Sequence, residues 1–179
     1  MLALSLILVG ALVVDDGAQP APVSAATTGI ASAFTPITPE RLVDTRIGLG
    51  APRRLVAAGT ALDVQVTGQL GIPDDATAVV ANVIAVGADR PGFLQLLPTG
   101  RATFGSSSTL NTDSPGMTIP NASFAPLGDG GRLTVYVSFT ADVVIDVSGY
   151  FTPAPASKAG RLVPLTPKRI LDSRVGLGW

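Results

Sequence analysis

The chain has 179 residues, of which 46% are hydrophobic and only 14% are charged, and its formal net charge is −1. The sequence contains neither cysteine nor histidine. The protein therefore has no disulfides, thiol nucleophiles or Cys/His zinc sites, and no catalytic triad with an imidazole base. No clustered basic run is present, so nucleic acid is not an expected partner.

The first 25 residues are typical of an export signal. Residues 2–14 form an apolar run shorter than the about 20 residues that a spanning helix needs, so no stable membrane span is expected. Val23-Ser24-Ala25 offers a small-residue cleavage site, although no basic residue precedes the run; the alternative is a buried N-terminal helix. We expect a signal peptide, with its apolar helix, over residues 1–25, a flexible leader over residues 26–33, and a secreted or cell-surface protein.

The chain after the leader has the periodicity of β-strands. Apolar and polar residues alternate over residues 62–66 and 133–139, which is typical of strands with one buried face, and Val143, Ile145 and Val147 follow at every second position. Residues 78–86 are almost wholly apolar, which predicts a central strand covered on both faces, with Asn82 buried among hydrogen-bond partners. Further strands are expected over residues 92–97, 108–111 and 118–126.

Turn signals separate these strands. The turn at residues 71–75 contains glycine and proline, and the turns at residues 129–131 and 141–142 predict hairpins. Many short strands with frequent turns favour an all-β fold. We expect a single antiparallel β-sandwich over residues 34–151, jelly-roll or Ig-like in layout.

One segment of the chain occurs twice. Residues 34–50 return as residues 162–178, with 9 identities in 17 positions, including two prolines, two arginines, one aspartate and two glycines. A complete domain of this kind does not fit into the remaining residues. We therefore expect a proline-containing linker over residues 152–160 and the start of a second, truncated repeat over residues 161–179.

These patterns resemble a repeat found in secreted bacterial proteins, especially those of high-G+C Gram-positive bacteria. The resemblance covers about residues 34–151. It is seen in the opening Pro39-x-Arg41-Leu42-x-Asp44-Thr45-Arg46 and in the ending Asp142-Val143-Val144-Ile145-Asp146-Val147-x-Gly149-Tyr150-Phe151. It is also seen in two middle segments, Ala78-Val79-Val80-Ala81-Asn82-Val83 and Gly92-Phe93-Leu94-x-Leu96-x-Pro98. Such units occur in tandem or beside hydrolases. The resemblance implies a non-catalytic structural or adhesive repeat, with neighbouring domains of a longer protein as partners, and it supplies no catalytic residues.

Arg41, Asp44 and Arg46 are charged residues of the opening motif. Guanidinium groups hold carboxylates in bidentate fashion, so this set predicts either a glycan- or carboxylate-binding cluster or an internal ion pair. On an extended strand Asp44 and Arg46 point to one face and Arg41 to the other. We favour the internal pair and predict that Arg46 contacts an acidic side chain of the same domain.

A glycan-binding module, which would direct a neighbouring hydrolase to the cell envelope, is the alternative function. Its partner would be a cell-wall or surface glycan, and sugars stack on exposed aromatic rings. Tyr136 points away from the face that carries Leu133 and Val135, so it is the candidate stacking platform. Tyr136 joins the three charged residues as a candidate for ligand binding.

Aspartates are the remaining candidates for chemistry. Asp129, Asp142 and Asp146 carry oxygen ligands suited to calcium, but no Asp-x-Asp-x-Asp loop is present, so neither a metal nor a cofactor is expected. Asp142 is assigned to the hairpin turn, and Asp146 is expected to be solvated or paired with an arginine. Glu40 is the only glutamate and the aspartates lie mainly in turns, so we expect no enzyme and no catalytic residues.

Overall fold

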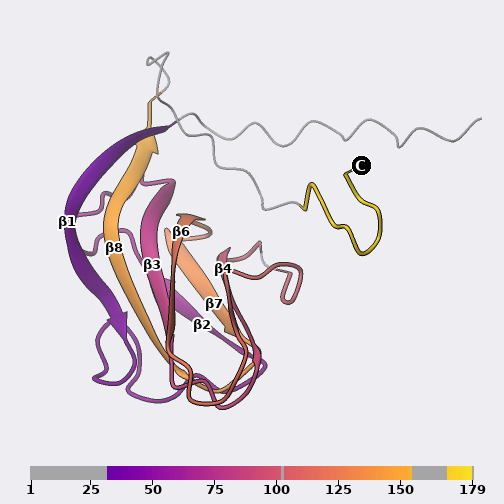
Figure 1. Ribbon diagram of the computed structural model, residues 1–179. Helices are drawn as coiled ribbons and strands as arrows, with labels where there is room; N and C mark the ends of the chain where they lie inside the picture. Colours follow the sequence, from indigo (N-terminus) through magenta and orange to yellow (C-terminus); the bar gives the residue numbers. More distant parts are fainter. Residues whose placement is uncertain (1–31, 102, 155–168, 179) are drawn as a thin grey trace, which may run out of the picture.

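The computed structural model describes residues 32–101, 103–154 and 169–178. Within these ranges the chain forms eight β-strands and no helix, and the strands make two antiparallel four-stranded sheets (Figure 1). The predicted all-β sandwich is confirmed. The expected signal peptide and nearly all of the leader lie outside the described residues. In the described part of the chain, no helix is long and apolar enough to cross a membrane.

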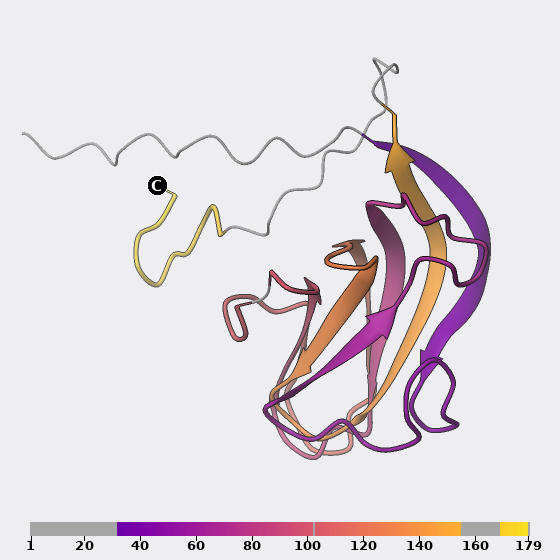
Figure 2. The same ribbon diagram turned by 180° about the vertical axis from the view of Figure 1, so that it is seen from behind.

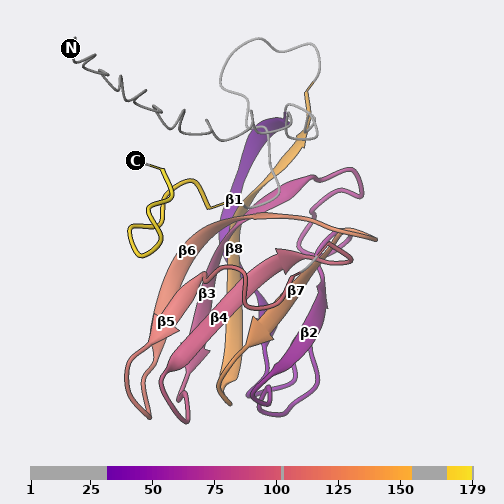
Figure 3. The same cartoon turned by 90° about the vertical axis from the view of Figure 1, so that its right-hand side faces the viewer.

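The two sheets have matching strand orders. The first sheet contains, in spatial order, β1 (Ser32–Asp44), β8 (Asp142–Pro153), β3 (Ala78–Val86) and β6 (Ile119–Pro126). The second contains β2 (Thr60–Gln65), β7 (Arg132–Val137), β4 (Gly92–Pro98) and β5 (Leu110–Thr112), which lie side by side in Figure 3. β1 pairs with β8, β2 with β7, β3 with β6 and β4 with β5. The last four strands therefore return along the first four in reverse order.

The core lies between the sheets, where alternate side chains of both inner faces meet. Seven of these side chains come from two central strands and are at most 1% exposed: Val79, Ala81, Val83 and Ala85 from β3, and Leu133, Val135 and Val137 from β7. Valine and alanine dominate this set, because β-branched and small side chains pack closely on a pleated surface. The inner face predicted for residues 133–139 is confirmed, and Phe139 is also fully buried.

The outer face of β3 differs from its prediction. Val80, Asn82, Ile84 and Val86 are only partly buried, so β3 is central in its sheet but covered fully on one face alone. The prediction that Asn82 is buried among hydrogen-bond partners is therefore wrong. An apolar run reports hydrophobic character on both faces, but it does not reveal whether a second layer exists to cover the outer one.

The prediction that the turns at residues 129–131 and 141–142 form hairpins is also wrong. The first turn leads from β6 in one sheet to β7 in the other, and the second leads from β7 back to β8. Among the described strands, β4 and β5 are the one pair of consecutive strands that are also hydrogen-bonded neighbours. The turn residues mark a change of direction, which occurs equally at a hairpin and at a crossing between sheets.

β1 and β8 bring the two ends of the domain together. Ser32 pairs with Pro153, so the chain enters and leaves the sandwich at the same end (Figure 2). The ring centroids of Phe34 and Phe151 lie 5.1 Å apart near this end. Strand pairing extends two residues beyond each expected boundary, from 34 back to 32 and from 151 on to 153. The expected linker at residues 152–160 therefore contributes its first two residues to β8.

Candidate functional site

A β-bulge in β1 brings two residues of the opening motif together. Arg41 pairs with Asp146 and Val43 with Ile145, so β1 has one extra residue, Leu42, against β8. Leu42 and Val43 are both buried, because the bulge resets the alternation of the strand. The predicted separation of Arg41 from Asp44 on opposite faces is therefore wrong: Arg41 Nη1 donates to Asp44 Oδ2 over 3.0 Å.

Asp44 is the centre of the charged cluster. Its side chain is 2% exposed, and it accepts hydrogen bonds from Arg46 Nη2 (2.6 Å), Arg46 Nε (2.9 Å) and the Arg46 backbone N–H (3.1 Å). The predicted contact between Arg46 and an acidic side chain is confirmed. These bonds, with the Arg46 guanidinium contributing most, lower the pKa of Asp44 from 3.8 to about 2.

Arg41 links this cluster to the last strand. Its Nε donates to Asp146 Oδ1 over 2.8 Å and its Nη2 donates to Asp146 Oδ2 over 3.3 Å. Of the two alternatives expected for Asp146, solvation or pairing with an arginine, the structure shows the pairing. Because Arg41 also donates to Asp44, one guanidinium joins the end of β1 to β8, and the contact is of the bidentate kind that fixes geometry.

The loop after Asp44 closes on itself and on β8. The Asp44 carbonyl accepts hydrogen bonds from the N–H groups of Gly48 (3.0 Å) and Leu49 (3.1 Å), and the Asp44 N–H donates to the Leu49 carbonyl. The Thr45 hydroxyl donates to Asp142 Oδ1 over 2.7 Å and accepts from the Val143 N–H over 3.0 Å. Asp142 therefore holds this loop, which corrects its assignment to a hairpin turn.

The second copy of the motif has the same internal bonds. Arg174 donates to Asp172 through its backbone N–H (3.1 Å), Nε (2.9 Å) and Nη2 (2.7 Å), and Arg169 Nη1 donates over 2.8 Å. The Asp172 N–H also donates to the Leu177 carbonyl, as Asp44 does to Leu49. The repeated residues therefore specify a local ion-paired loop. The aspartates of the chain already occupy the Nε and Nη2 donors of Arg46 and Arg174, so this cluster needs no ligand carboxylate to be satisfied.

Asp44→Asn is expected to destabilise the domain by about 1–3 kcal/mol at neutral pH, because both arginines lose a charged acceptor. A carboxylate whose folded pKa is lowered contributes stability above its unfolded pKa and loses it as the pH falls. The difference in unfolding free energy between the wild type and the variant should therefore hold down to about pH 5 and shrink between about pH 4 and pH 2. Urea unfolding across this range measures it. A difference that persists unchanged at pH 2 would show that the ionised Asp44 carboxylate is not the stabilising group.

Tyr136 lies apart from the arginine cluster. It projects from the outer face of β7 in the second sheet, whereas the cluster lies at the end of β1 in the first. Its ring is stacked with Phe104 at a centroid distance of 4.9 Å and an interplanar angle of 8°, and Phe93 packs at 5.9 Å. Tyr136 is therefore half-buried and does not act as the outermost platform. The four predicted ligand-binding residues do not form one site.

Phe104 is the exposed aromatic residue at this place, with 51% of its surface accessible. The sequence gives little signal for it, because it lies in a glycine- and serine-containing loop without strand alternation. Its partner Tyr136 was identifiable from the alternation of β7. The stacked pair places one aromatic ring from a loop over another from the sheet.

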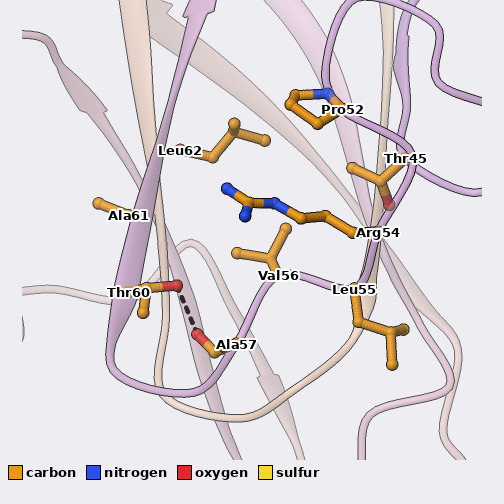
Figure 4. Close-up of a pocket in the computed structure, with 9 residues that line it drawn as sticks. All are labelled: Thr45, Pro52, Arg54, Leu55, Val56, Ala57, Thr60, Ala61 and Leu62. Carbon is orange, nitrogen blue, oxygen red and sulfur yellow. Dashed lines mark hydrogen bonds between the residues drawn. The ribbon is translucent and has the colours of Figure 1, made fainter.

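A small hollow of about 170 Å³ lies beside the loop that follows β1 (Figure 4). It is lined by Thr45, Pro52, Arg54, Leu55, Val56, Ala57, Thr60, Ala61 and Leu62. In Figure 4 the side chain of Arg54 extends across it toward Leu62, above Val56. The aliphatic stem of Arg54 therefore covers apolar surface while its charged end reaches solvent. The hollow is smaller than the about 300 Å³ at which small-molecule sites begin.

The aspartates considered for calcium are engaged elsewhere or separated. Asp142 accepts from Thr45 and Asp146 from Arg41. Across residues 32–101, 103–154 and 169–178, no three acidic side chains gather in an arrangement suited to a metal ion.

Comparison of the chain with protein-family models, curated proteins and solved structures finds no match. The resemblance to a secreted bacterial repeat therefore stays a prediction. What the chain does must be inferred from its fold and from the contacts of its own residues.

Proposed function

We propose that the domain is a non-catalytic jelly-roll module of a secreted or cell-surface bacterial protein, acting as a structural or adhesive repeat. The strand order supports the jelly roll over an Ig-like layout. In an Ig-like sandwich the first strand lies beside the second, whereas here β1 lies beside β8. Each of the first four strands pairs with one of the last four, in reverse order. This is the strand order of a jelly roll, in which one long β-hairpin is folded into two sheets.

The position of the two chain ends carries the proposal. Ser32 and Pro153 are paired neighbours, so the two ends of the domain lie side by side. The domain therefore adds little to the distance between the chain segments before and after it. A spacer would gain length from a domain with ends at opposite poles. The observed arrangement suits a module attached beside other domains, with its remaining surface presented to a partner.

The bonding of the charged residues supports a non-catalytic role. Asp44 is held by two arginines, Asp146 by Arg41 and Asp142 by Thr45. A general acid or base must reach a substrate proton, whereas these carboxylates satisfy groups of the fold. In the repeated loop Asp172 has the same two-arginine arrangement, which favours a structural purpose for the motif.

Export of the chain tests the location. Expressed with its N-terminus in a Gram-positive host, the protein should be recovered outside the cytoplasm with a mass that corresponds to loss of residues 1–25. Leu8→Arg places a charge in the apolar run and should leave the protein inside the cell, uncleaved. Mass spectrometry of the two fractions measures both outcomes. Retention of the intact wild-type chain in the cytoplasm would contradict the proposal.

A glycan-binding role is the second candidate, and one observation favours it. Phe104 is half-exposed and stacked on Tyr136, and an exposed ring of this kind matches the apolar face of a sugar. This role is compatible with an attachment module, because adhesion to a cell envelope requires recognition of its glycans.

A further inference from the structure

An open groove lies on the outer face of the second sheet. It has a volume of about 490 Å³ and is lined by Ala61, Asp63, Thr99, Gly100, Phe104 and Thr134. These residues come from β2, β7, the turn after β4 and the loop that carries Phe104. Its size falls within the about 300–1,000 Å³ of small-molecule sites. No residue of this groove belongs to the repeated arginine motif.

A line of polar groups forms the floor of the groove, in which Thr134 and Thr99 are buried and Asp63 is exposed. Asp63 and Thr134 are cross-strand partners on β2 and β7, and the Thr134 hydroxyl donates to Asp63 Oδ1 over 2.6 Å. The hydroxyls of Thr134 and Thr99 lie 3.0 Å apart. Among the described residues no group donates to Asp63 Oδ2, and Asp63 is exposed. The line therefore keeps a carboxylate oxygen available to a ligand donor.

Phe104 forms the apolar wall of the groove. Its ring is nearly parallel to that of Tyr136, which supports it from the sheet, and Phe93 packs against Tyr136 in turn. Phe104 is nevertheless 51% exposed. A ring that is held by aromatic neighbours and is still open to solvent is a stacking surface that loses little freedom when a ligand arrives.

A buried glutamine holds the loop that places Phe104. Gln95 is 0% exposed although it lies on the outer face of β4, opposite Tyr136 in the ladder. Its Nε2 donates to the hydroxyls of Ser107 (2.7 Å) and Ser106 (3.2 Å), and its Oε1 accepts from the Gly105 N–H (3.0 Å). The donor and the acceptor of this buried amide are both satisfied by residues that follow Phe104, which fixes the loop against the sheet. The groove is thus a built feature of the fold.

We propose that this groove binds a neutral saccharide, with the apolar face of one sugar ring on Phe104. Sugar hydroxyls would donate to Asp63, whose carboxylate is held in place by the buried hydroxyl of Thr134. The groove lining contains one acidic and no basic side chain, so an acidic sugar would meet an unfavourable charge. This inference rests on the proposed attachment module and supplies its ligand class and its contact residues.

Affinity electrophoresis of the full chain tests the proposal. Native gels would contain a β-glucan, a mannan or glycol chitin as neutral probes, and polygalacturonate as the acidic comparison. At least one neutral polysaccharide should retard the wild type, and polygalacturonate should not. Phe104→Ala should weaken the retardation about fivefold, since the loss of an aromatic stacking partner costs on the order of 1 kcal/mol. Asp63→Asn should weaken it in the same gels.

Phe124→Ala is the matched control. Phe124 is 65% exposed on β6 of the other sheet, so this variant removes an equally open ring from outside the groove and should bind as the wild type does. Thermal melts of all variants establish that each remains folded. The proposal is overturned if no neutral polysaccharide retards the chain, if Phe104→Ala binds normally, or if Phe124→Ala loses as much affinity.

Two outcomes separate this proposal from the proposed function. Release of new reducing ends from a bound polysaccharide would contradict the non-catalytic role and leave the saccharide groove standing. Export and processing of a chain that binds none of the neutral probes would support the exported module and refute the saccharide.

Discussion

Val135→Asp is expected to abolish the cooperative unfolding transition of the domain. Val135 is 0% exposed at the middle of β7, between Leu62 on β2 and Leu96 on β4. Its side chain points into the space between the two sheets, where a carboxylate has apolar neighbours. Burying an unpaired charge there costs at least about 4 kcal/mol. This cost is a lower bound, and domains are stable by only about 5–15 kcal/mol, so we expect the folded state to be lost.

Circular dichroism during heating measures this loss. Leu55→Asp makes the same kind of change at a residue that is 55% exposed, and it should alter the unfolding free energy by no more than about 0.5 kcal/mol. The pair of variants separates the effect of burial from that of the added charge. A Val135→Asp protein that melts cooperatively at the wild-type temperature would refute the placement of β7 in the core.

The positions of the strands could be predicted because alternation directly reflects burial. Residues 78–86 match β3 at both ends, and the inner face of residues 133–139 is the buried one. The partner of each strand could not be predicted in this way, since both sheets turn an apolar face inward and the pattern is the same for either. The turn at residues 129–131 therefore predicted a hairpin, although it joins the two sheets.

The candidate site was predictable only where the contact is local in sequence. Arg46 lies two residues from Asp44, and their ion pair follows from the spacing. Arg41 was assigned to the wrong face because the bulge at Leu42 depends on pairing with β8, about 100 residues later. The groove around Phe104 combines distant segments through Gln95, whose burial beneath a loop no periodic pattern reveals.

Gly50→Ala is expected to destabilise the domain by about 2–4 kcal/mol. Gly50 has φ +65°, a left-handed conformation that costs an L-residue about 1–2 kcal/mol. A Cβ at this position would also overlap the carbonyl oxygen of Leu42. That carbonyl belongs to the buried bulge of β1, so the loop or the strand must shift to accommodate the methyl group.

Gly59→Ala isolates the first of these two costs, the left-handed backbone. Gly59 has φ +74°, similar to Gly50, but a Cβ there would meet no atom within 4 Å. Its variant should lose only the backbone term, about 1–2 kcal/mol, in urea unfolding. The excess loss in Gly50→Ala then measures how rigidly the ion-paired loop is held against β1. Equal losses in the two variants would mean that the loop moves freely away from Leu42. A rigid loop is also expected in the second copy, because a Cβ at Gly178 would overlap the Ile170 carbonyl in the same way.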